Sequence, residues 1–426
     1  MRILFLSHAF NSLTQRLFVA LQEQGHEVSV EFDINDEVAL EAVELYRPEL
    51  IIAPFLKRAI PEAIWREHVC LVVHPGIPGD RGPSALDWAI LNGESRWGVT
   101  VLQANAEMDA GDIWASSEFP MRDASKASLY RNEVTEASVT AVRLALERFQ
   151  AGDFKPQPLD YSIPDVRGEL RPLMQQSDRC IDWQQDDTET VLRKIRCADG
   201  FPGVRDTLSE REMFLYDARP EKNLRGKPGD VIFRCGGAIC RATVDGAIWI
   251  GHLRDKLHEH PFKLPATRVL ADEVEGLPEI TADETSGYRD IWYEEIGEVG
   301  YLHFPFYNGA MGTEQCNRLR RAYIEARERD TRVIVLMGGP DYWSNGMHLN
   351  LIEASASAAA ESWNNITAID DLARAIIDNK PPMTVAALQG NAGTGGVLLA
   401  PAPAQLSARA GRVLHPQSKL IGNPSA

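Results

Sequence analysis

The chain has 426 residues, of which 44% are hydrophobic and 25% are charged, and its formal net charge is -17. This length exceeds one ordinary domain and the composition is that of a folded protein, so we expect two or three domains. The acidic charge makes nucleic acid an unlikely partner. No apolar run is long enough to span a membrane or form the core of a signal peptide, so we expect a cytoplasmic protein without membrane contact.

The cysteines do not indicate a disulfide framework, because six of them are spread over this long chain. Cys235 and Cys240 form a lone pair without a second pair at zinc spacing. We therefore expect reduced thiols and no metal site.

Residues 1–160 alternate between strand and helix patterns, which the hydrophobic spacing distinguishes. We expect strands at residues 1–7, 27–32, 50–53, 70–73 and 99–102, and helices at residues 13–24, 37–46, 86–91 and 137–149, with a further helical stretch around Trp65. This repeated order predicts an α/β domain, a parallel sheet covered by helices.

Residues 161–265 change character, because the apolar runs shorten and glycine turns multiply. Short strands joined by tight turns are expected at residues 230–233, 239–244 and 247–250, which favours a small β-barrel. Residues 266–287, acidic and rich in turns, are expected to form a linker.

Residues 288–426 return to the strand–helix order and predict a partial α/β domain. We expect strands at residues 300–306, 332–337 and 383–388, and helices at residues 315–328 and 366–378. A short tail without a closing helix follows, so we expect this third domain to be truncated.

Two polar segments follow strands of the first domain: HPGIPGDRG begins at His74, and NAEMDAGD carries Asp109 and Asp112. Ligands of parallel α/β sheets collect beyond the carboxyl ends of the strands. A carboxylate beside an imidazole can orient the ring and stabilise its protonated form, which makes an acid–base pair. A histidine at a strand end is as often structural as functional, so the residues alone leave both interpretations open.

HPGIPGDRG and WGVTVLQANAEMDAGDIW resemble the signature of folate-dependent formyltransferases, including those acting on methionyl-tRNA. IDWQQDDTETVLRKIRCADGFPG and the barrel after it resemble that family's C-terminal domain. The resemblance implies that His74 and Asp109 are catalytic. The family's asparagine stands two residues before the histidine, where this chain has Val72, so an amide donor to the developing oxyanion is missing. Ordinary amine formylation is therefore disfavoured.

The same resemblance implies a binding site for 10-formyltetrahydrofolate. The residues expected to line it are Phe55, Leu56, Asn105 and Asp112. The first strand–helix turn lacks a G-x-G-x-x-G pattern, which disfavours a dinucleotide.

The third domain contains MGGPDYWSNGMHLN and LQGNAGTGGVLLA, each after an expected strand. Glycine-rich turns can aim backbone N–H groups into a cavity, although composition alone slightly favours close packing at a strand–helix turn. The pair is similar to the crotonase (enoyl-CoA hydratase/isomerase) family. That resemblance implies that Gly346, Met347, Gly395 and Gly396 hold the thioester carbonyl of a coenzyme A derivative. Leu398 stands where the hydratase has a catalytic glutamate, so hydration is not expected.

The order of the three modules resembles the HoxX-type hydrogenase maturation proteins. This implies transfer of formyl from 10-formyltetrahydrofolate to coenzyme A, then decarbonylation of formyl-CoA to carbon monoxide for a nickel–iron centre. Small-molecule substrates and the hydrogenase maturation machinery would be the partners. Two alternatives remain: a formyltransferase for an amine acceptor, either aminoacyl-tRNA or an amino sugar, and a truncated, non-catalytic protein that binds folate or a partner.

Overall fold

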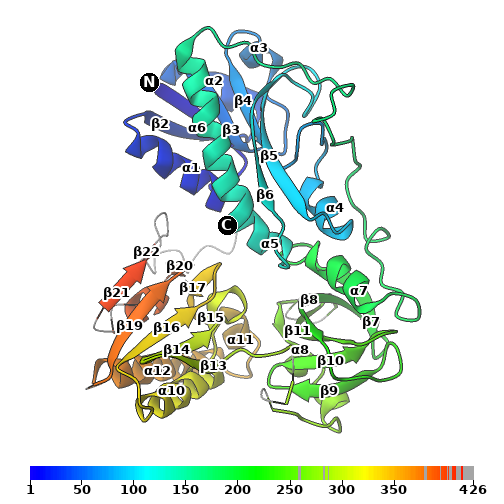
Figure 1. The fold of residues 1–426 in the computed structure, drawn as a ribbon, viewed down its shortest axis with the longest axis vertical. Coiled ribbons are helices and arrows are strands. Elements are labelled where there is room, and N and C mark those ends of the chain that lie inside the picture. Colours follow the sequence, from blue (N-terminus) through cyan, green and yellow to red (C-terminus); the bar gives the residue numbers. More distant parts are fainter. Residues whose placement is uncertain are drawn as a thin grey trace. The chain divides into compact units, whose positions relative to one another are not determined.

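The structure, a computed structural model, describes residues 1–257, 261–281, 284–285, 287–378, 381–393, 395–400, 402, 405–408 and 414–415. The chain divides into two compact units (Figure 1). The first unit comprises residues 1–181 and 193–204, and the second comprises residues 182–192 and 205–426. Within the described part of the chain, no helix is both long and apolar enough to cross a membrane.

The first unit is built on a six-stranded sheet. Its strands are β1 (Arg2–Ser7), β2 (Glu27–Phe32), β3 (Leu50–Phe55), β4 (Cys70–His74), β5 (Arg96–Gln103) and β6 (Ile113–Pro120). They lie in the order β2-β1-β3-β4-β5-β6. The pairs β1–β2, β1–β3 and β3–β4 are parallel. The α/β fold expected from the strand–helix alternation is confirmed.

The last two strands of this sheet run differently. β4 and β5 are antiparallel, with Leu71 opposite Gln103 and His74 opposite Thr100. β5 and β6 are also antiparallel, and β6 was not expected. The carboxyl ends of β4 and β5 therefore lie at opposite edges of the sheet. Our expectation that both polar segments leave one edge of a fully parallel sheet does not hold for β5.

Helices cover both faces of the sheet (Figure 1). They are α1 (Ser12–Glu23), α2 (Asp36–Tyr46), α3 (Glu62–Trp65), α4 (Ala85–Leu91), α5 (Lys126–Leu129) and α6 (Thr135–Ala151). One buried cluster joins Leu17 of α1, Ala89 of α4 and Val142 of α6. A second cluster contains Val43 of α2 and Ile64 of α3. Each amphipathic helix thus buries its apolar stripe on the sheet.

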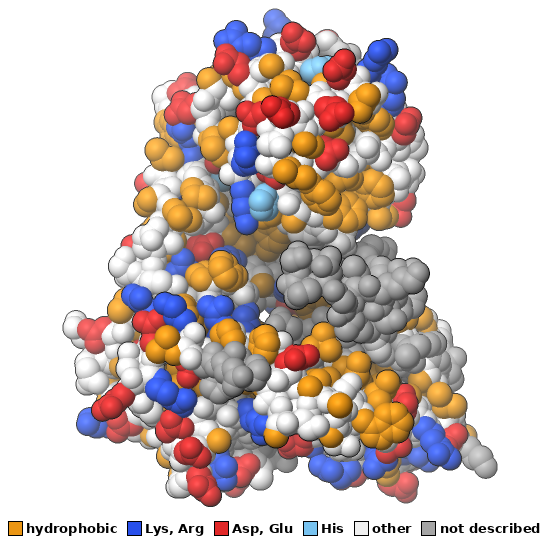
Figure 2. All heavy atoms as spheres, turned by 180° about the vertical axis from the view of Figure 1, so that it is seen from behind, with side chains coloured by type: hydrophobic (Ala, Val, Ile, Leu, Met, Phe, Trp, Pro, Cys, Tyr) orange, Lys and Arg blue, Asp and Glu red, His pale blue; other side chains and the backbone are white. Residues whose placement is uncertain are grey.

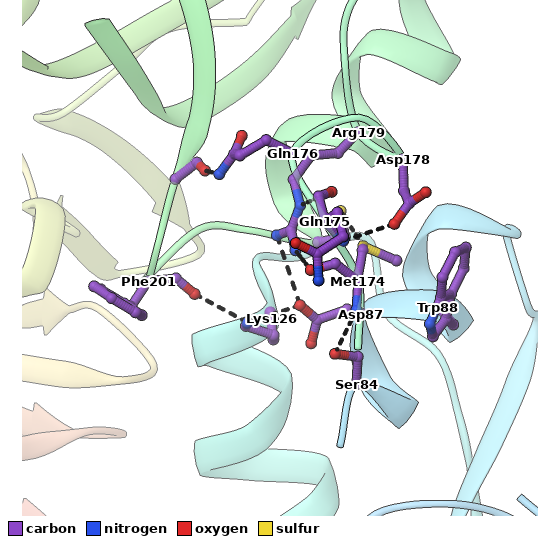
Figure 3. A network of polar contacts seen from close by, with 12 residues as sticks. Ser84, Asp87, Trp88, Lys126, Met174, Gln175, Gln176, Asp178, Arg179 and Phe201 are labelled. Carbon is purple, nitrogen blue, oxygen red and sulfur yellow. Dashed lines mark hydrogen bonds and ion pairs between the residues drawn. The ribbon is translucent and has the colours of Figure 1, made fainter. Parts of the chain in front are cut away.

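The segment that follows α6 returns to the first unit, although we expected residues 161–181 to belong to a second domain. Figure 3 shows the polar network that holds it. Asp87 of α4 lies 3.0 Å from Lys126 Nζ and 3.6 Å from the buried guanidinium of Arg179. Lys126 also donates to the carbonyl of Phe201, at 3.0 Å. A buried carboxylate needs such partners, so this network fixes the segment against α4.

The second unit begins with an antiparallel sheet in the region where we expected a small barrel. Its strands are β7 (Val204–Leu208), β8 (Arg211–Glu221), β9 (Val231–Cys235), β10 (Ala238–Ala242), β11 (Ala247–Asp255) and β12 (Leu264–Pro265). Their order is β7-β8-β11-β10-β9, and β12 pairs with β11. Helix α7 (Thr188–Arg196) precedes them. Trp249 and Tyr216 are among the largest fully buried side chains of this region.

The segment that we expected as a linker packs against this sheet. It contains α8 (Ala266–Val269) and α9 (Ala271–Val274), and Leu270 is buried. Thr285 Oγ1 donates to Glu221 Oε2 at 3.0 Å, and the same oxygen accepts from Trp249 Nε1 at 2.9 Å. Buried polar groups are normally paired, and this segment supplies the partner.

A five-stranded sheet forms the rest of the second unit. Its strands are β13 (Trp292–Ile296), β14 (Val299–Phe304), β16 (Val333–Gly338), β19 (Met383–Leu388) and β21 (Gln405–Ala408). β14, β16, β19 and β21 are parallel neighbours, while β13 is antiparallel to β14. Helices α10 (Thr313–Arg327) and α12 (Ala358–Ile377) contribute buried Tyr323 and Leu372 to its core.

Short elements at the ends of these strands carry the two glycine-rich motifs. They are β15 (Ala310–Met311), β17 (Tyr342–Ser344), β18 (Gly346–Met347), α11 (Leu349–Glu353), β20 (Asn391–Gly393), α13 (Gly395–Leu399) and β22 (Leu414–His415). β15 pairs with β18, and β20 lies between β17 and β22. On the face seen in Figure 2, Asp and Glu side chains are interspersed with Lys and Arg side chains.

Candidate active sites

His74 lies at the end of β4 and is 4% exposed. Its Nε2 is 2.8 Å from Asp80 Oδ1, and its Nδ1 is 3.5 Å from Asp109 Oδ1. Asp80 is 2% exposed. The imidazole is therefore enclosed between two carboxylates, and each carboxylate is delivered by a loop.

Asp109 reaches His74 from the loop between β5 and β6. Its Oδ2 accepts a hydrogen bond from Gly82 N at 3.1 Å. Its backbone lies in the left-handed region, with φ of 55°, which residues other than glycine seldom adopt. Aspartate is among the residues that tolerate this conformation best. The loop turns back to His74 even though β5 ends at the opposite edge of the sheet.

The electrostatics of the site favour a protonated His74. Burial lowers the pKa of its imidazole, but the hydrogen bond to Asp80 and the charges of Asp109 and Asp80 outweigh burial and leave the pKa above its usual value. An imidazolium in this position can donate a proton or stabilise negative charge that develops on a substrate.

Glycine at position 76 makes the contact between His74 and Asp80 possible. A Cβ at Gly76 would lie 2.5 Å from Asp80 Oδ1 and 2.6 Å from His74 Nε2. The loop is fixed from β5, where Trp97 Nε1 donates to Pro75 O at 2.9 Å. Thr100 Oγ1 donates to Gly76 O at 2.7 Å, so the backbone around the imidazole is held by buried hydrogen bonds.

Sequence reasoning missed Asp80. The signal that would have found it is its place in HPGIPGDRG, six residues after His74 with two glycines and two prolines between them. Such a stretch forms tight turns, which can bring the carboxylate back to the histidine.

The four residues expected to bind folate lie near β3 and the loop of Asp109. Phe55 is the last residue of β3 and Leu56 follows it. Both are half-buried, and Leu56 packs against the same buried cluster as Val72 of β4. Asn105 and Asp112 are exposed, at the two ends of the loop, where Gln103 N donates to Asp112 O at 2.9 Å. The apolar pair thus lies at the end of β3, and the polar pair lies in the loop that carries Asp109.

The residues expected to hold a thioester carbonyl approach one another through their backbones. They are Gly346, Met347, Gly395 and Gly396. Gly346 has φ of 74°, and a Cβ there would lie 2.7 Å from Gly395 N and 3.1 Å from Gly396 N. A Cβ at Gly396 would lie 2.2 Å from the carbonyl of Ser344. The structure therefore brings the two glycine-rich motifs into direct contact, with Met347 next to Gly346. The side chain of Leu398 lies outside the described part of the structure.

Asn365 of α12, which sequence reasoning missed, holds the strand of Met347 in place. It is fully buried, its Oδ1 accepts from His348 N at 3.1 Å, and its Nδ2 donates to Met311 O at 2.8 Å. The sequence signal is its position on the apolar stripe of the helix, three and four residues before buried Ala368 and Ile369. Two backbone groups that flank the motif thus depend on one amide.

Comparison with known proteins identifies the two formyltransferase modules. Residues 19–146 match the family described as formyl transferase, and residues 173–259 match the formyl transferase C-terminal domain. The hydrogenase maturation factor HoxX of Bradyrhizobium diazoefficiens is 56% identical over 423 residues, which cover 99% of this chain and 74% of HoxX. The chain belongs to the HoxX family.

A solved relative agrees with this assignment. The crystal structure of HypX from Aquifex aeolicus in complex with tetrahydrofolic acid has 50% sequence identity and a TM-score of 0.92, over 98% of this chain and 73% of HypX. The methionyl-tRNA formyltransferase of Thermotoga neapolitana is 28% identical over 50% of this chain and 67% of its own length. This HoxX-family chain is a formyltransferase, as the sequence predicted.

Proposed function

We propose that the chain transfers the formyl group of 10-formyltetrahydrofolate to coenzyme A at His74 and Asp109, in the cytoplasm. Its crotonase-like region then releases carbon monoxide from formyl-CoA, as a ligand for the nickel–iron centre of a hydrogenase. The formyl transferase match, membership of the HoxX family and the tetrahydrofolic acid in the HypX complex support the proposal. The observation that carries it is the buried imidazole of His74 between two carboxylates.

The residues beside β3 suit a folate. Phe55 and Leu56 offer half-buried apolar surface to a flat ring system, and exposed Asn105 and Asp112 offer an amide and a carboxylate to its polar edge. Ligand sites commonly combine such an apolar lining with a few polar groups. We assign these four residues to folate binding.

The chemistry of the first step follows from the two charged partners. When bound, 10-formyltetrahydrofolate supplies a formyl carbonyl on its nitrogen N10. Asp109 accepts the thiol proton of coenzyme A as sulfur bonds to the formyl carbon, and Nδ1 of protonated His74 donates a hydrogen bond to the carbonyl oxygen while keeping its proton. The carbon–nitrogen bond then breaks, and His74 delivers a proton to N10. The proton on Asp109 then passes to His74, so the net result is the movement of one proton from the thiol to N10.

Val72 fits a thiol acceptor. In amine formylation, an amide at this position would assist the developing oxyanion. The thiolate that forms as Asp109 takes the thiol proton is a stronger nucleophile than an amine and needs less of this assistance. His74 then supplies the proton donor that faces the carbonyl.

In the second step, backbone N–H groups of Met347 and of the turn at Gly395 and Gly396 hold the thioester carbonyl of formyl-CoA. The carbon–sulfur bond breaks and the formyl hydrogen passes to sulfur as a proton, which yields carbon monoxide and free coenzyme A. The close contact of Gly346 with Gly395 brings the two sets of N–H groups to one place. Fixed donors of this kind stabilise charge at a carbonyl oxygen.

The test is to incubate the purified protein with 10-formyltetrahydrofolate and coenzyme A. We expect formyl-CoA by mass spectrometry and carbon monoxide by haem absorbance. His74→Gln should lower formyl-CoA formation by about 100-fold or more, as loss of a general acid–base group does. His303→Gln, which changes the ring paired with Glu294 at 2.9 Å, is the control and should keep the activity. Formylation of an amine without coenzyme A would contradict the proposal and favour the amine acceptor.

A further inference from the structure

We propose that Asp80 is the positioning residue of the formyl-transfer site: it orients the ring of His74 and leaves Asp109 free to exchange a proton with the acceptor. The inference rests on the proposed function only in taking coenzyme A as the acceptor. The contact between Asp80 and His74 does not depend on the substrate. Asp80 has no place in the histidine–aspartate pair that the sequence indicated.

The two carboxylates hold the imidazole unequally. Asp80 Oδ1 lies at 2.8 Å from Nε2, a full hydrogen bond, whereas Asp109 Oδ1 lies at 3.5 Å from Nδ1, the distance of a loose ion pair. A charge-assisted hydrogen bond is the stronger of the two contacts, so Asp80 determines the ring orientation. Nδ1 then faces Asp109 and is the nitrogen available for proton exchange.

The burial of Asp80 supports a dedicated role. Its side chain is 1% exposed, and its Oδ2 has no hydrogen-bond partner among the described residues. A buried carboxylate is unfavourable unless a positive charge compensates it. His74 is the cation within reach, and Gly76 keeps free the space in which the two side chains meet.

Asp109 is suited to the other role. It is more exposed than Asp80, at 14% against 1% for the side chains, and therefore nearer to an incoming thiol. One of its oxygens is fixed by Gly82 N, and the other faces His74. The charged groups that face the imidazole are Asp80 from its own loop and Asp109 from the loop after β5.

The experiment follows the imidazole of His74 by NMR in the substrate-free protein, with histidine labelled and His74→Gln used for assignment. In Asp80→Asn we expect the pKa of His74 to fall by about one unit or more, because burial remains while the stronger partner is lost. The limb of the pH–rate profile that reports His74 should move with it, and kcat should fall about 10- to 100-fold with little change in KM. Asp80→Glu should restore part of both.

Glu294→Gln is the matched control, because it removes the carboxylate from a solvent-exposed pair with His303 of nearly the same length. It should leave the titration and activity of His74 unchanged. A folded Asp80→Asn protein with an unaltered His74 titration would overturn the proposal. If that variant does not fold, the wild-type spectrum decides: we expect the strongly hydrogen-bonded ring proton on Nε2, and finding it on Nδ1 would overturn the proposal. Failure of the wild type to make formyl-CoA would instead contradict the acceptor.

Discussion

The two candidate sites achieve charge stabilisation by different physical means. Around His74 the groups are ionisable side chains, buried Asp80 and partly buried Asp109, with the imidazole between them. At Gly346 and Gly395 the groups are backbone amides brought together because Gly346 has no side chain. The first site therefore depends on charge and pH. The second site depends on the room that the absence of a side chain at Gly346 leaves for the backbone. Each arrangement predicts a different kind of sensitivity to mutation.

Two buried histidines make the same contrast in their pKa values. His74 and His348 are 4% and 6% exposed. Burial lowers the pKa of His348 to about 4, and the nearby His252 adds to this effect. The pKa of His74 is raised although burial opposes this, because Asp80 and Asp109 face its ring. Burial by itself lowers the pKa of a histidine, as at His348. At His74 the adjacent carboxylates raise the pKa above its usual value despite burial.

The largest expected effect comes from Asn365→Ala, which tests how the second site is supported. The change leaves His348 N and Met311 O, both in a buried environment, without their present partner. Each unmade buried bond costs about 1 to 3 kcal/mol, so the free energy of unfolding should fall by about 4 kcal/mol in urea denaturation. Asn364→Ala, on the exposed neighbouring position, is the control and should change it by less than about 0.5 kcal/mol. Equal effects of the two variants would show that Asn365 does not hold the strand.

The second effect concerns pH and separates the two histidines. His348 is neutral in the folded state down to pH about 4, while in the unfolded chain it takes up a proton below its ordinary pKa of 6.5. Stability from this residue is therefore present above pH 6.5 and is lost as the pH falls towards 4. A shift of this size corresponds to about 3 kcal/mol at most. His348→Asn, which keeps an acceptor for Leu351 N, should lack this dependence when unfolding is measured by urea at each pH.

His74 should show the opposite sign. Its folded pKa lies above 6.5, so its contribution to stability is complete below pH 6.5 and is lost as the pH rises through the raised pKa. The two windows do not overlap, which lets one titration distinguish them. If the wild type loses no more stability between pH 6.5 and 4 than His348→Asn does, the lowered pKa of His348 is contradicted.

Local patterns predicted the elements well but not their directions. Apolar spacing located β1 to β5 and the helices around them, because periodicity records which side of an element is buried. It contained nothing about whether β5 runs with or against β4, since that depends on how the connection through α4 packs. β6 was not predicted: its first two residues, Ile113 and Trp114, fell within the formyltransferase motif, and no element was assigned to the rest of the strand.

The candidate residues also divide into those that the sequence pattern indicated and those that only the folded structure reveals. His74 and Asp109 stood out because each follows a strand in a polar segment, and the structure places them 3.5 Å apart. Asp80 and Asn365 did not stand out, because their importance arises from burial and from contacts that form only when the chain folds. Asn365 bridges to Met311, 54 residues away, which spacing along the chain cannot show. Polar residues on apolar faces are the sequence signal for such contacts.

The smallest of the expected effects, Gly346→Ala, tests the spatial character of the second site. The left-handed φ of 74° and a Cβ only 2.7 Å from Gly395 N both oppose a side chain here, so the two motifs must separate. Release of carbon monoxide from supplied formyl-CoA should fall about 30-fold, equivalent to about 2 kcal/mol. Formyl transfer at His74 should be unchanged. Supplying formyl-CoA directly keeps the first site out of the measurement.

Gly297→Ala is the matched control for this last prediction. Gly297 also has a left-handed backbone, with φ of 61°, but a Cβ there meets nothing within 4 Å. Both variants share the conformational strain of about 1 kcal/mol, and only Gly346→Ala adds the contact with Gly395. Carbon monoxide release that fell equally in the two variants would assign the loss to strain in the unit as a whole. A loss confined to Gly346→Ala would tie the activity to the close approach of the two glycine motifs.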